Sequence, residues 1–204
     1  MPEPLRTPYA GYDVLRKWDT PSWNDQTREV VGRRLHEVPE RRFLRTDEWA
    51  TLEAVCARLL PQPDRPDDPV PIVPWIDRKL DLNEGAGYRY ETMPPLREAW
   101  RLGIAGIEKE SGRRHGARFS ELAPAEQDGI LRAIQEGEVS GEPWDELPPV
   151  RFFAEVLLKG VVGVYYSHPA AWSEIGYSGP ASPRGYVRLG ADQRDPWEAE
   201  ERDA

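Results

Sequence analysis

Several kinds of chemistry are excluded by what this sequence lacks. Cys56 is the only cysteine among 204 residues, so the chain has no internal disulfide, no CxxC redox pair and no CxxCH haem attachment. The longest apolar run, residues 160–166, is far shorter than the ~20 residues that cross a bilayer. The GxSxG elbow, the phosphate-binding loop and the GxGxxG dinucleotide fingerprint are also missing. We therefore expect no cofactor in this chain and no membrane insertion.

Basic residues are outnumbered. The 27 lysines and arginines against 36 acidic residues give a formal charge of -9 and a pI of about 5.0. Proteins that bind nucleic acid or anionic lipid need a basic surface, so neither kind of partner is expected. Residues 1–18 also contain no apolar signal segment. We expect a cytoplasmic location, and export together with a partner is the alternative.

Proline, by contrast, is abundant, with 21 residues against a usual share of ~5%. Several prolines mark helix boundaries: Pro39 and Pro61 each follow an apolar stripe of helical spacing. Ser22 and Thr46 are candidate N-caps. Alternation typical of strands is scarce, so we predict an all-α fold, a single bundle of about six helices. The predicted helices span residues 23–38, 46–60, 71–80, 95–113, 124–136 and 148–165.

Composition divides the chain into three parts. Residues 1–21 form an irregular N-terminal arm, residues 22–190 form the helical domain, and residues 191–204 form an acidic tail that we expect to be disordered. Within the domain, residues 167–190 are rich in glycine, proline and aromatic side chains. We predict a structured, non-helical segment there, with turns that need glycine, and we expect the block of residues 163–190 to face a partner.

Two glycine pairs lie inside predicted helices. Gly103 and Gly106, and Gly160 and Gly163, recur as GxxG. A dinucleotide fingerprint would place its glycines between a strand and a helix. These glycines are therefore expected to allow close helix packing.

The three histidines offer little chemistry. His36 and His115 are expected at the surface, and no pair has a metal-ligand spacing. His168 follows Tyr165-Tyr166-Ser167 at a helix end. A structural or interface role is favoured for His168, and acid–base catalysis is the alternative. The sequence predicts no metal site and no catalytic residue beyond that alternative.

The two aromatic segments hold the candidate interface residues, because tryptophan, tyrosine and arginine are the usual anchors of protein interfaces. Packing of the same side chains inside the chain is the alternative. In the arm the candidates are Tyr9, Tyr12, Trp18 and Trp23. In the block they are Tyr165, Tyr166, His168, Trp172, Gly176, Tyr177, Gly179, Pro180, Pro183, Gly185, Tyr186 and Arg188.

Four stretches carry a resemblance to a known family. They read FLRTDEWATLEAVCARLLPQ, PIVPWIDRKL, FSELAPAEQDGILRAI and FFAEVLLKGVVGVYYSHPAAWSEIGYSGPASPRGYVRLG. Together they resemble the gluconate 2-dehydrogenase subunit 3 family, the small subunits of bacterial FAD-dependent sugar and alcohol dehydrogenases. The resemblance covers about residues 40–190, and residues 163–190 are its most specific part.

The resemblance implies a non-catalytic small subunit that assists assembly and maturation. Its partner would be a large flavoprotein of the glucose–methanol–choline (GMC) type, which holds FAD and oxidises the substrate, and a cytochrome c subunit accompanies some such complexes. Small subunits of this family often carry a twin-arginine signal, and the N-terminus of this chain departs from that pattern. A stand-alone enzyme using His168 and a helical scaffold for an unrelated protein are the alternatives.

Overall fold

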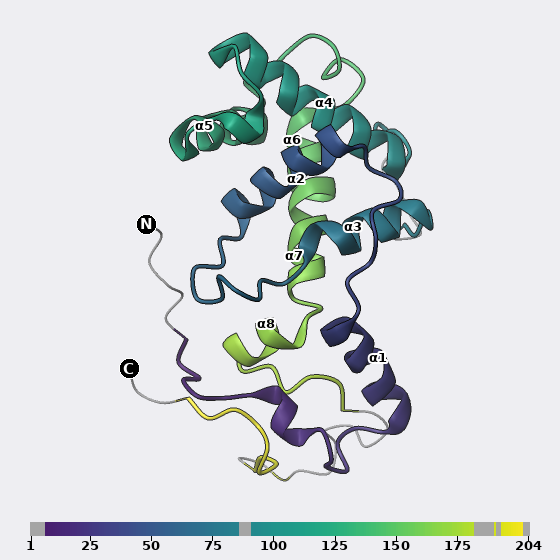
Figure 1. The fold of residues 1–204 in the computed structure, drawn as a ribbon, viewed down its shortest axis with the longest axis vertical. Coiled ribbons are helices and arrows are strands. Elements are labelled where there is room, and N and C mark those ends of the chain that lie inside the picture. The colour runs from purple at the N-terminus through teal and green to yellow at the C-terminus, as the bar shows by residue number, and fades with distance from the viewer. Residues whose placement is uncertain (1–6, 86–90, 182–189, 191–192, 202–204) are drawn as a thin grey trace. The chain divides into compact units, whose positions relative to one another are not determined.

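The computed structural model describes residues 7–85, 91–181, 190 and 193–201, and over these residues the fold is helical without a strand (Figure 1). This confirms the all-α prediction. The chain divides into two compact units. Unit 1 joins residues 1–38 to residues 165–204, and unit 2 comprises residues 39–164. The boundaries predicted from the sequence lie elsewhere, after residues 21 and 190.

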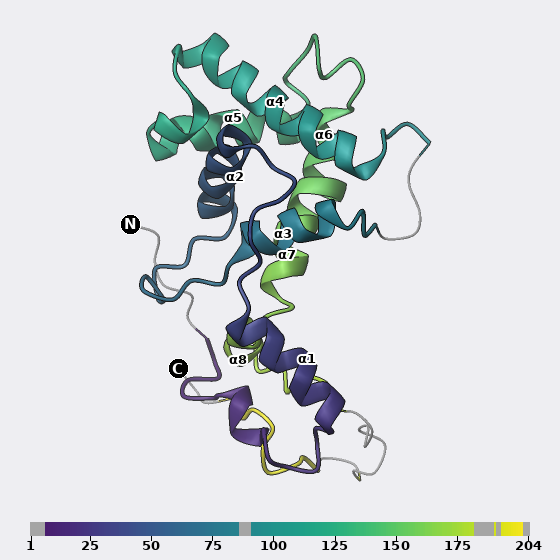
Figure 2. The same ribbon diagram turned by 45° about the vertical axis from the view of Figure 1, so that its right-hand side comes forward.

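Unit 2 contains most of the helices. The last helix of unit 2 runs without a break from Pro149 to Tyr165, and its middle part, Phe152–Leu158, is a π-helix. Helix α4 crosses this long helix in both views (Figures 1 and 2). Each helix predicted in this unit begins and ends within two residues of its observed bounds. These bounds are α2 Thr46–Leu59, α3 Ile72–Asp81, α4 Leu96–His115, the 3-10 turn η2 Phe119–Glu121, α5 Pro124–Glu136, α6 Pro149–Arg151, η3 Phe152–Leu158 and α7 Lys159–Tyr165.

Glycines allow aromatic rings to pack against the helices of unit 2. A Cβ atom on Gly103 would overlap the ring of Phe152, and one on Gly106 would overlap the indole of Trp144. A Cβ on Gly160 would lie 2.7 Å from Trp100. Gly163 has open space instead. The prediction of close helix packing is thus confirmed for Gly103 and Gly160, whose ring neighbours Phe152 and Trp100 lie on helices, whereas Gly106 admits the ring of Trp144 from a turn.

A buried carboxylate fixes the segment that leads into α2. Asp77, on α3, is fully buried. Its oxygens accept the backbone N–H groups of Arg42 at 2.6 Å, Phe43 at 3.1 Å and Leu44 at 2.7 Å. Three amides that no helix or sheet would satisfy are therefore paired inside the protein.

Two further carboxylates are buried against arginine. Glu48, in the first turn of α2, accepts the backbone N–H of Arg45 at 2.8 Å and forms an ion pair with the Arg45 guanidinium at 2.9 Å. Glu110, on α4, pairs with Arg113 at 2.6 Å and Arg114 at 2.9 Å. Each buried negative charge in this unit therefore has donors at hydrogen-bond distance.

Unit 1 is built from both ends of the chain. Its helices are the 3-10 turn η1 Val14–Lys17, α1 Asp25–His36 and α8 Pro169–Glu174. The purple N-terminal segment and the yellow C-terminal segment run side by side in Figures 1 and 2. The prediction of a wholly non-helical C-terminal block is wrong for α8. Pro169 occupies its first position, where proline favours a helix.

The start of α1 also differs from the prediction. The cap is Asn24, whose Oδ1 accepts the N–H of Thr27 at 2.9 Å. Ser22, the predicted cap, instead accepts a hydrogen bond from Lys17 Nζ at 3.1 Å. Serine and asparagine both favour the N-cap position, so the sequence alone could not choose between Ser22 and Asn24. The hydrogen bond from Lys17 engages Ser22 and leaves Asn24 as the cap. No helix in the described part of the chain has the length and apolar character needed to cross a membrane.

Candidate partner-binding site

The aromatic side chains of the two predicted interface segments pack on each other inside unit 1. Val14, Trp23, Val31 and Trp172 form a buried cluster. Partly buried side chains that pack against this cluster are Tyr12, Leu15, Trp18 and Leu35. Trp18 meets Trp23 edge-on, with 5.6 Å between ring centroids. Much of the aromatic surface of the arm is therefore used within the chain.

Hydrogen bonds tie the arm to α8. The backbone N–H of Val14 donates to Ser173 Oγ at 3.1 Å, and the hydroxyl of Thr7 donates to the carbonyl of Glu174. The phenol of Tyr9 donates to Glu201 at 3.2 Å, which brings part of the acidic tail to the arm. Segments more than 150 residues apart in sequence thus form one surface.

Among the described residues of unit 1, Lys17 is a buried cation. Its side chain is only 1% exposed. Nζ donates to Ser22 Oγ at 3.1 Å and to the carbonyl of Pro180 at 3.4 Å, and it lies 5.2 Å from the ring centroid of Trp23. Burial lowers the pKa of Lys17 from its ordinary 10.5 to about 8, while the carboxylates of Glu198 and Asp195 oppose that shift.

Two turns in the C-terminal block require glycine. Gly176 has a φ of +66°, and a Cβ there would lie 2.7 Å from the ring of Tyr9. Gly179 has a φ of +70°, and a Cβ there would lie 3.2 Å from the rings of Trp172 and Trp23. The backbone is left-handed and the aromatic rings approach it closely, as the sequence predicted for this block.

His168 and Tyr165 hold α8 in place. His168 is the N-cap residue of α8, and its Nδ1 accepts the N–H of Ala170 at 3.3 Å. Tyr165 is buried, and its hydroxyl donates to Glu174 at 2.7 Å. The indole N–H of Trp172 donates to the carbonyl of Tyr166 at 2.7 Å. These contacts give His168, Tyr165 and Trp172 structural roles.

Three large apolar side chains within six residues of Trp172 in the sequence are exposed. Tyr166, Ile175 and Tyr177 are 37%, 46% and 45% exposed. Tyr177 meets the buried ring of Trp172 edge-on at 5.7 Å, and Ile175 ends α8. We call Tyr166, Ile175 and Tyr177 the aromatic ledge. Exposed apolar side chains on a rigid, buried base are typical of protein interfaces.

The remaining candidates divide into two groups. Pro180 accepts the Lys17 hydrogen bond and is half-buried. Pro183, Gly185, Tyr186 and Arg188 lie outside the described residues. Lys17, Ser173 and Ile175 were not among the residues predicted from the sequence. No local pattern marks Lys17 as buried, since one of its hydrogen-bond acceptors, the carbonyl of Pro180, is 163 residues away along the chain.

Among the residues that the structure describes, no group of three or more histidine, cysteine, aspartate or glutamate side chains is arranged to hold a metal ion. Cys56 is buried, and burial raises the pKa of its thiol to about 12, with the charge of Glu53 adding to the shift. A thiol with that pKa is not nucleophilic near neutral pH.

The fold and this surface define an all-helical protein with an exposed aromatic ledge on a rigid base. A sequence match to the family described as gluconate 2-dehydrogenase subunit 3 covers residues 46–179, about two thirds of the chain. The chain belongs to this family, which confirms the resemblance. Comparison with curated proteins and with solved structures gave no significant match. The family match includes all the helices from α2 to α8 and ends two residues after Tyr177.

Proposed function

We propose that this chain is the non-catalytic small subunit of a dehydrogenase complex and binds a large GMC-type flavoprotein through the aromatic ledge. The family name, that of a dehydrogenase subunit, supports membership of such a complex. The observation that carries the interface is the exposure of Tyr166, Ile175 and Tyr177 around buried Trp172, at the end of the family match. FAD would be held by the large subunit.

The rigidity of the ledge favours tight binding. Tyr177 is backed by Trp172, which is itself held by its indole hydrogen bond to Tyr166 and by the packing of Gly179. Side chains already fixed in the free protein lose little conformational entropy on association. A surface of this kind would support the folding of a partner that has not yet bound its flavin. Assistance in maturation is therefore part of the proposal, as are a cytoplasmic location and a cytochrome c subunit as a further partner.

Co-expression with the large flavoprotein subunit tests the proposal. We expect a stoichiometric complex, with less flavin and less activity in the large subunit when this chain is omitted. Equal flavin loading and equal activity without this chain would contradict the maturation role.

Charge placed on the ledge tests the interface. The double variant Ile175→Lys and Tyr177→Lys should weaken the complex at least about 100-fold, because two apolar contacts are replaced by charges that must lose water. Leu82→Lys is the matched control, since Leu82 is 53% exposed in unit 2 and lies outside the ledge. Comparable weakening by the control would overturn the assignment of the ledge.

A further inference from the structure

Unit 2 contains a groove formed by residues other than those of the aromatic ledge. It is formed by the last turns of α2, the following loop and the start of α3, and it has a volume of about 570 Å³. This is within the range of sites that bind ligands, ~300–1,000 Å³. Its floor includes the buried side chains of Cys56, Val70, Ile72 and Val73. The prolines of its walls are Pro61, Pro63, Pro69, Pro71 and Pro74.

A glutamine fixes both ends of the loop that forms one wall. Gln62 Nε2 donates to the carbonyl of Val70 at 3.3 Å, and the N–H of Val70 donates to Gln62 Oε1 at 2.8 Å. Proline restricts the backbone of the rest of the loop. The groove is therefore preformed, and a ligand would not have to order it.

The chemistry of the walls limits what they recognise. Proline has no backbone N–H, so these walls cannot pair with a strand in the way that a sheet edge does. The floor offers apolar contact. The thiol of Cys56 remains protonated near neutral pH because burial raises its pKa to about 12. An occupant would be selected by apolar side chains that fit the groove.

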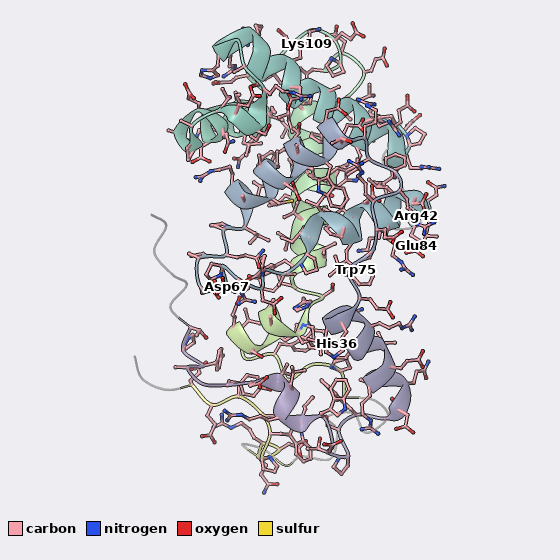
Figure 3. All side chains as sticks on the ribbon, viewed as in Figure 1. His36, Arg42, Asp67, Trp75, Glu84 and Lys109 are labelled. Carbon is pink, nitrogen blue, oxygen red and sulfur yellow. The ribbon has the colours of Figure 1, made fainter. Side chains whose placement is uncertain are left out.

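Acidic side chains lie in the groove and directly before one of its walls. Glu53 lines the groove from α2, and Asp67 and Asp68 are exposed on the loop immediately before Pro69, which lines it. Figure 3 shows Asp67 at the outer turn of this loop. Asp64 is neutralised by Arg65 at 2.8 Å, whereas neither Asp67 nor Asp68 forms an ion pair with any described residue. The groove therefore combines an apolar floor with uncompensated negative charge.

We infer that this groove binds an extended segment of the large subunit in which one or two large apolar side chains are flanked by arginine or lysine. The apolar side chains would fill the space above Val70 and Ile72, and the basic residues would lie beside Asp67 and Asp68. The inference rests on the proposed function for the identity of the chain that supplies this segment. The chemistry of the segment follows from the groove alone.

Two probe peptides test that chemistry on the full chain. One has the sequence Gly-Arg-Gly-Leu-Trp-Gly-Arg-Gly with blocked ends, and the other has glutamate in place of both arginines. We expect the arginine peptide to shift the NMR signals of the Cys56, Val70, Ile72 and Val73 amides, and to bind at least about tenfold more tightly than the glutamate peptide at low salt. Equal binding of both peptides, shifts centred elsewhere or no shifts at millimolar peptide would overturn the inference.

Substitutions at the groove sharpen the test. Ala57 lines the groove from the exposed side of α2, so Ala57→Arg should fill it and repel a basic segment. Ala105, exposed on α4, gives the matched control Ala105→Arg. Both substitutions replace alanine by arginine on a helix surface, and both residues favour helices. We expect at least about tenfold weaker binding of the arginine peptide for Ala57→Arg and unchanged binding for Ala105→Arg. Equal losses would overturn the site.

Removal of charge tests Asp67 and Asp68 separately. Asp67→Asn with Asp68→Asn should weaken binding of the arginine peptide and flatten its salt dependence, because two screened attractions are lost. Asp81→Asn with Glu84→Gln is the control, since both side chains are exposed after the end of the groove-forming sequence. An unchanged salt dependence in the Asp67 and Asp68 variant would contradict a role for these two carboxylates.

The affinity of the complex with the large subunit tests whether that subunit supplies the bound segment. Ala57→Arg should weaken that complex relative to Ala105→Arg, and an unaffected complex would overturn the assignment to the large subunit. If the wild-type chain forms no complex, the proposed function fails, and the peptide measurements still decide the chemistry of the groove. A small apolar molecule such as toluene that binds there more tightly than the arginine peptide would overturn recognition of a protein segment.

Discussion

The buried charged side chains of unit 2 are carboxylates, whereas the buried charged side chain of unit 1, over its described residues, is Lys17. Asp77, Glu48 and Glu110 each accept backbone amides or pair with arginine. Lys17 donates to a hydroxyl and a carbonyl and lies near an aromatic face. The buried carboxylates therefore receive hydrogen bonds from amides or guanidinium groups, whereas the hydrogen-bond acceptors of the Lys17 ammonium are neutral and burial lowers its pKa.

The two units also use glycine differently. In unit 2, Gly103 and Gly106 are helical and admit aromatic rings against the helix. In unit 1, Gly176 and Gly179 have positive φ and turn the backbone beneath aromatic rings. The same residue therefore serves helix packing in one unit and turn geometry in the other, and substitutions should have different physical costs in each.

The largest expected effect is the loss of Asp77. Asp77→Ala leaves the N–H groups of Arg42, Phe43 and Leu44 without acceptors, two of them buried. At about 1–3 kcal/mol for each buried unsatisfied group, we expect on the order of 3–5 kcal/mol of destabilisation. Hydrogen exchange should show lost protection in α2 and α3. The control Asp81→Ala changes an exposed carboxylate of the same helix, and an equal loss there would contradict the role of Asp77 as the acceptor of these three amides.

The second effect concerns glycine in unit 2. Gly103→Ala should destabilise unit 2 by about 2–3 kcal/mol, because the new methyl group overlaps the ring of Phe152 in a packed interior. Gly112, on the same helix, has open space around it. Gly112→Ala should therefore stabilise α4 by about 0.5–1 kcal/mol through helix propensity alone. Urea denaturation measures both, and the same sign for the two variants would refute the packing argument.

Helix positions were predictable because their signals are local. Apolar spacing and proline boundaries placed the helix of residues 124–136 at its observed bounds. The helix at residues 169–174 was not predicted, since six residues carry too little periodicity and the segment is flanked by glycine. Its stability comes from contacts of Trp172 with the arm, which no local pattern reveals.

The candidate site was predictable only as a list of residue types. Aromatic composition selected Tyr177 and Tyr166, which are exposed, together with Trp23 and Trp172, which are buried. Sequence could not separate them, because their exposure depends on the pairing of the two chain ends. Lys17 escaped selection for the same reason, and the groove beside α2 appeared in the sequence only as a proline-rich loop.

The third effect tests the buried lysine of unit 1 through pH. In the folded protein the pKa of Lys17 is about 8, whereas in the unfolded chain it is the ordinary 10.5. Between pH 8 and pH 10.5, unfolding therefore takes up a proton at Lys17. The free energy of unfolding contributed by Lys17 should therefore rise with pH across this window, by on the order of 1–3 kcal/mol. Below pH 8 the lysine is charged in both states and its contribution is constant.

Lys17→Met removes this slope and retains an apolar chain of similar length against Trp23. Unfolding of unit 1, followed by the fluorescence of its tryptophans from pH 7 to 10, should show a smaller rise with pH in the variant than in the wild type. Arg16→Met, an exposed neighbour, should leave the slope unchanged. A wild-type slope of zero or of negative sign after subtraction of the variant would show that the ammonium is not destabilised by burial.

The smallest effect compares how the two units cap their helices. In unit 2, the N-terminal amides of α2 and α5 are supported by glutamates inside the first turn, where Glu126 accepts the N–H of Ala123 at 2.9 Å. In unit 1, the cap of α1 is the side chain of Asn24. Asn24→Ala should cost about 1 kcal/mol and increase hydrogen exchange in the first turn of α1. Gln26→Ala, exposed in the same turn, should cost nothing, since alanine has the higher helix propensity. If the two variants behave alike, the start of α1 is fixed by the packing of Trp23 and Val31 rather than by its cap.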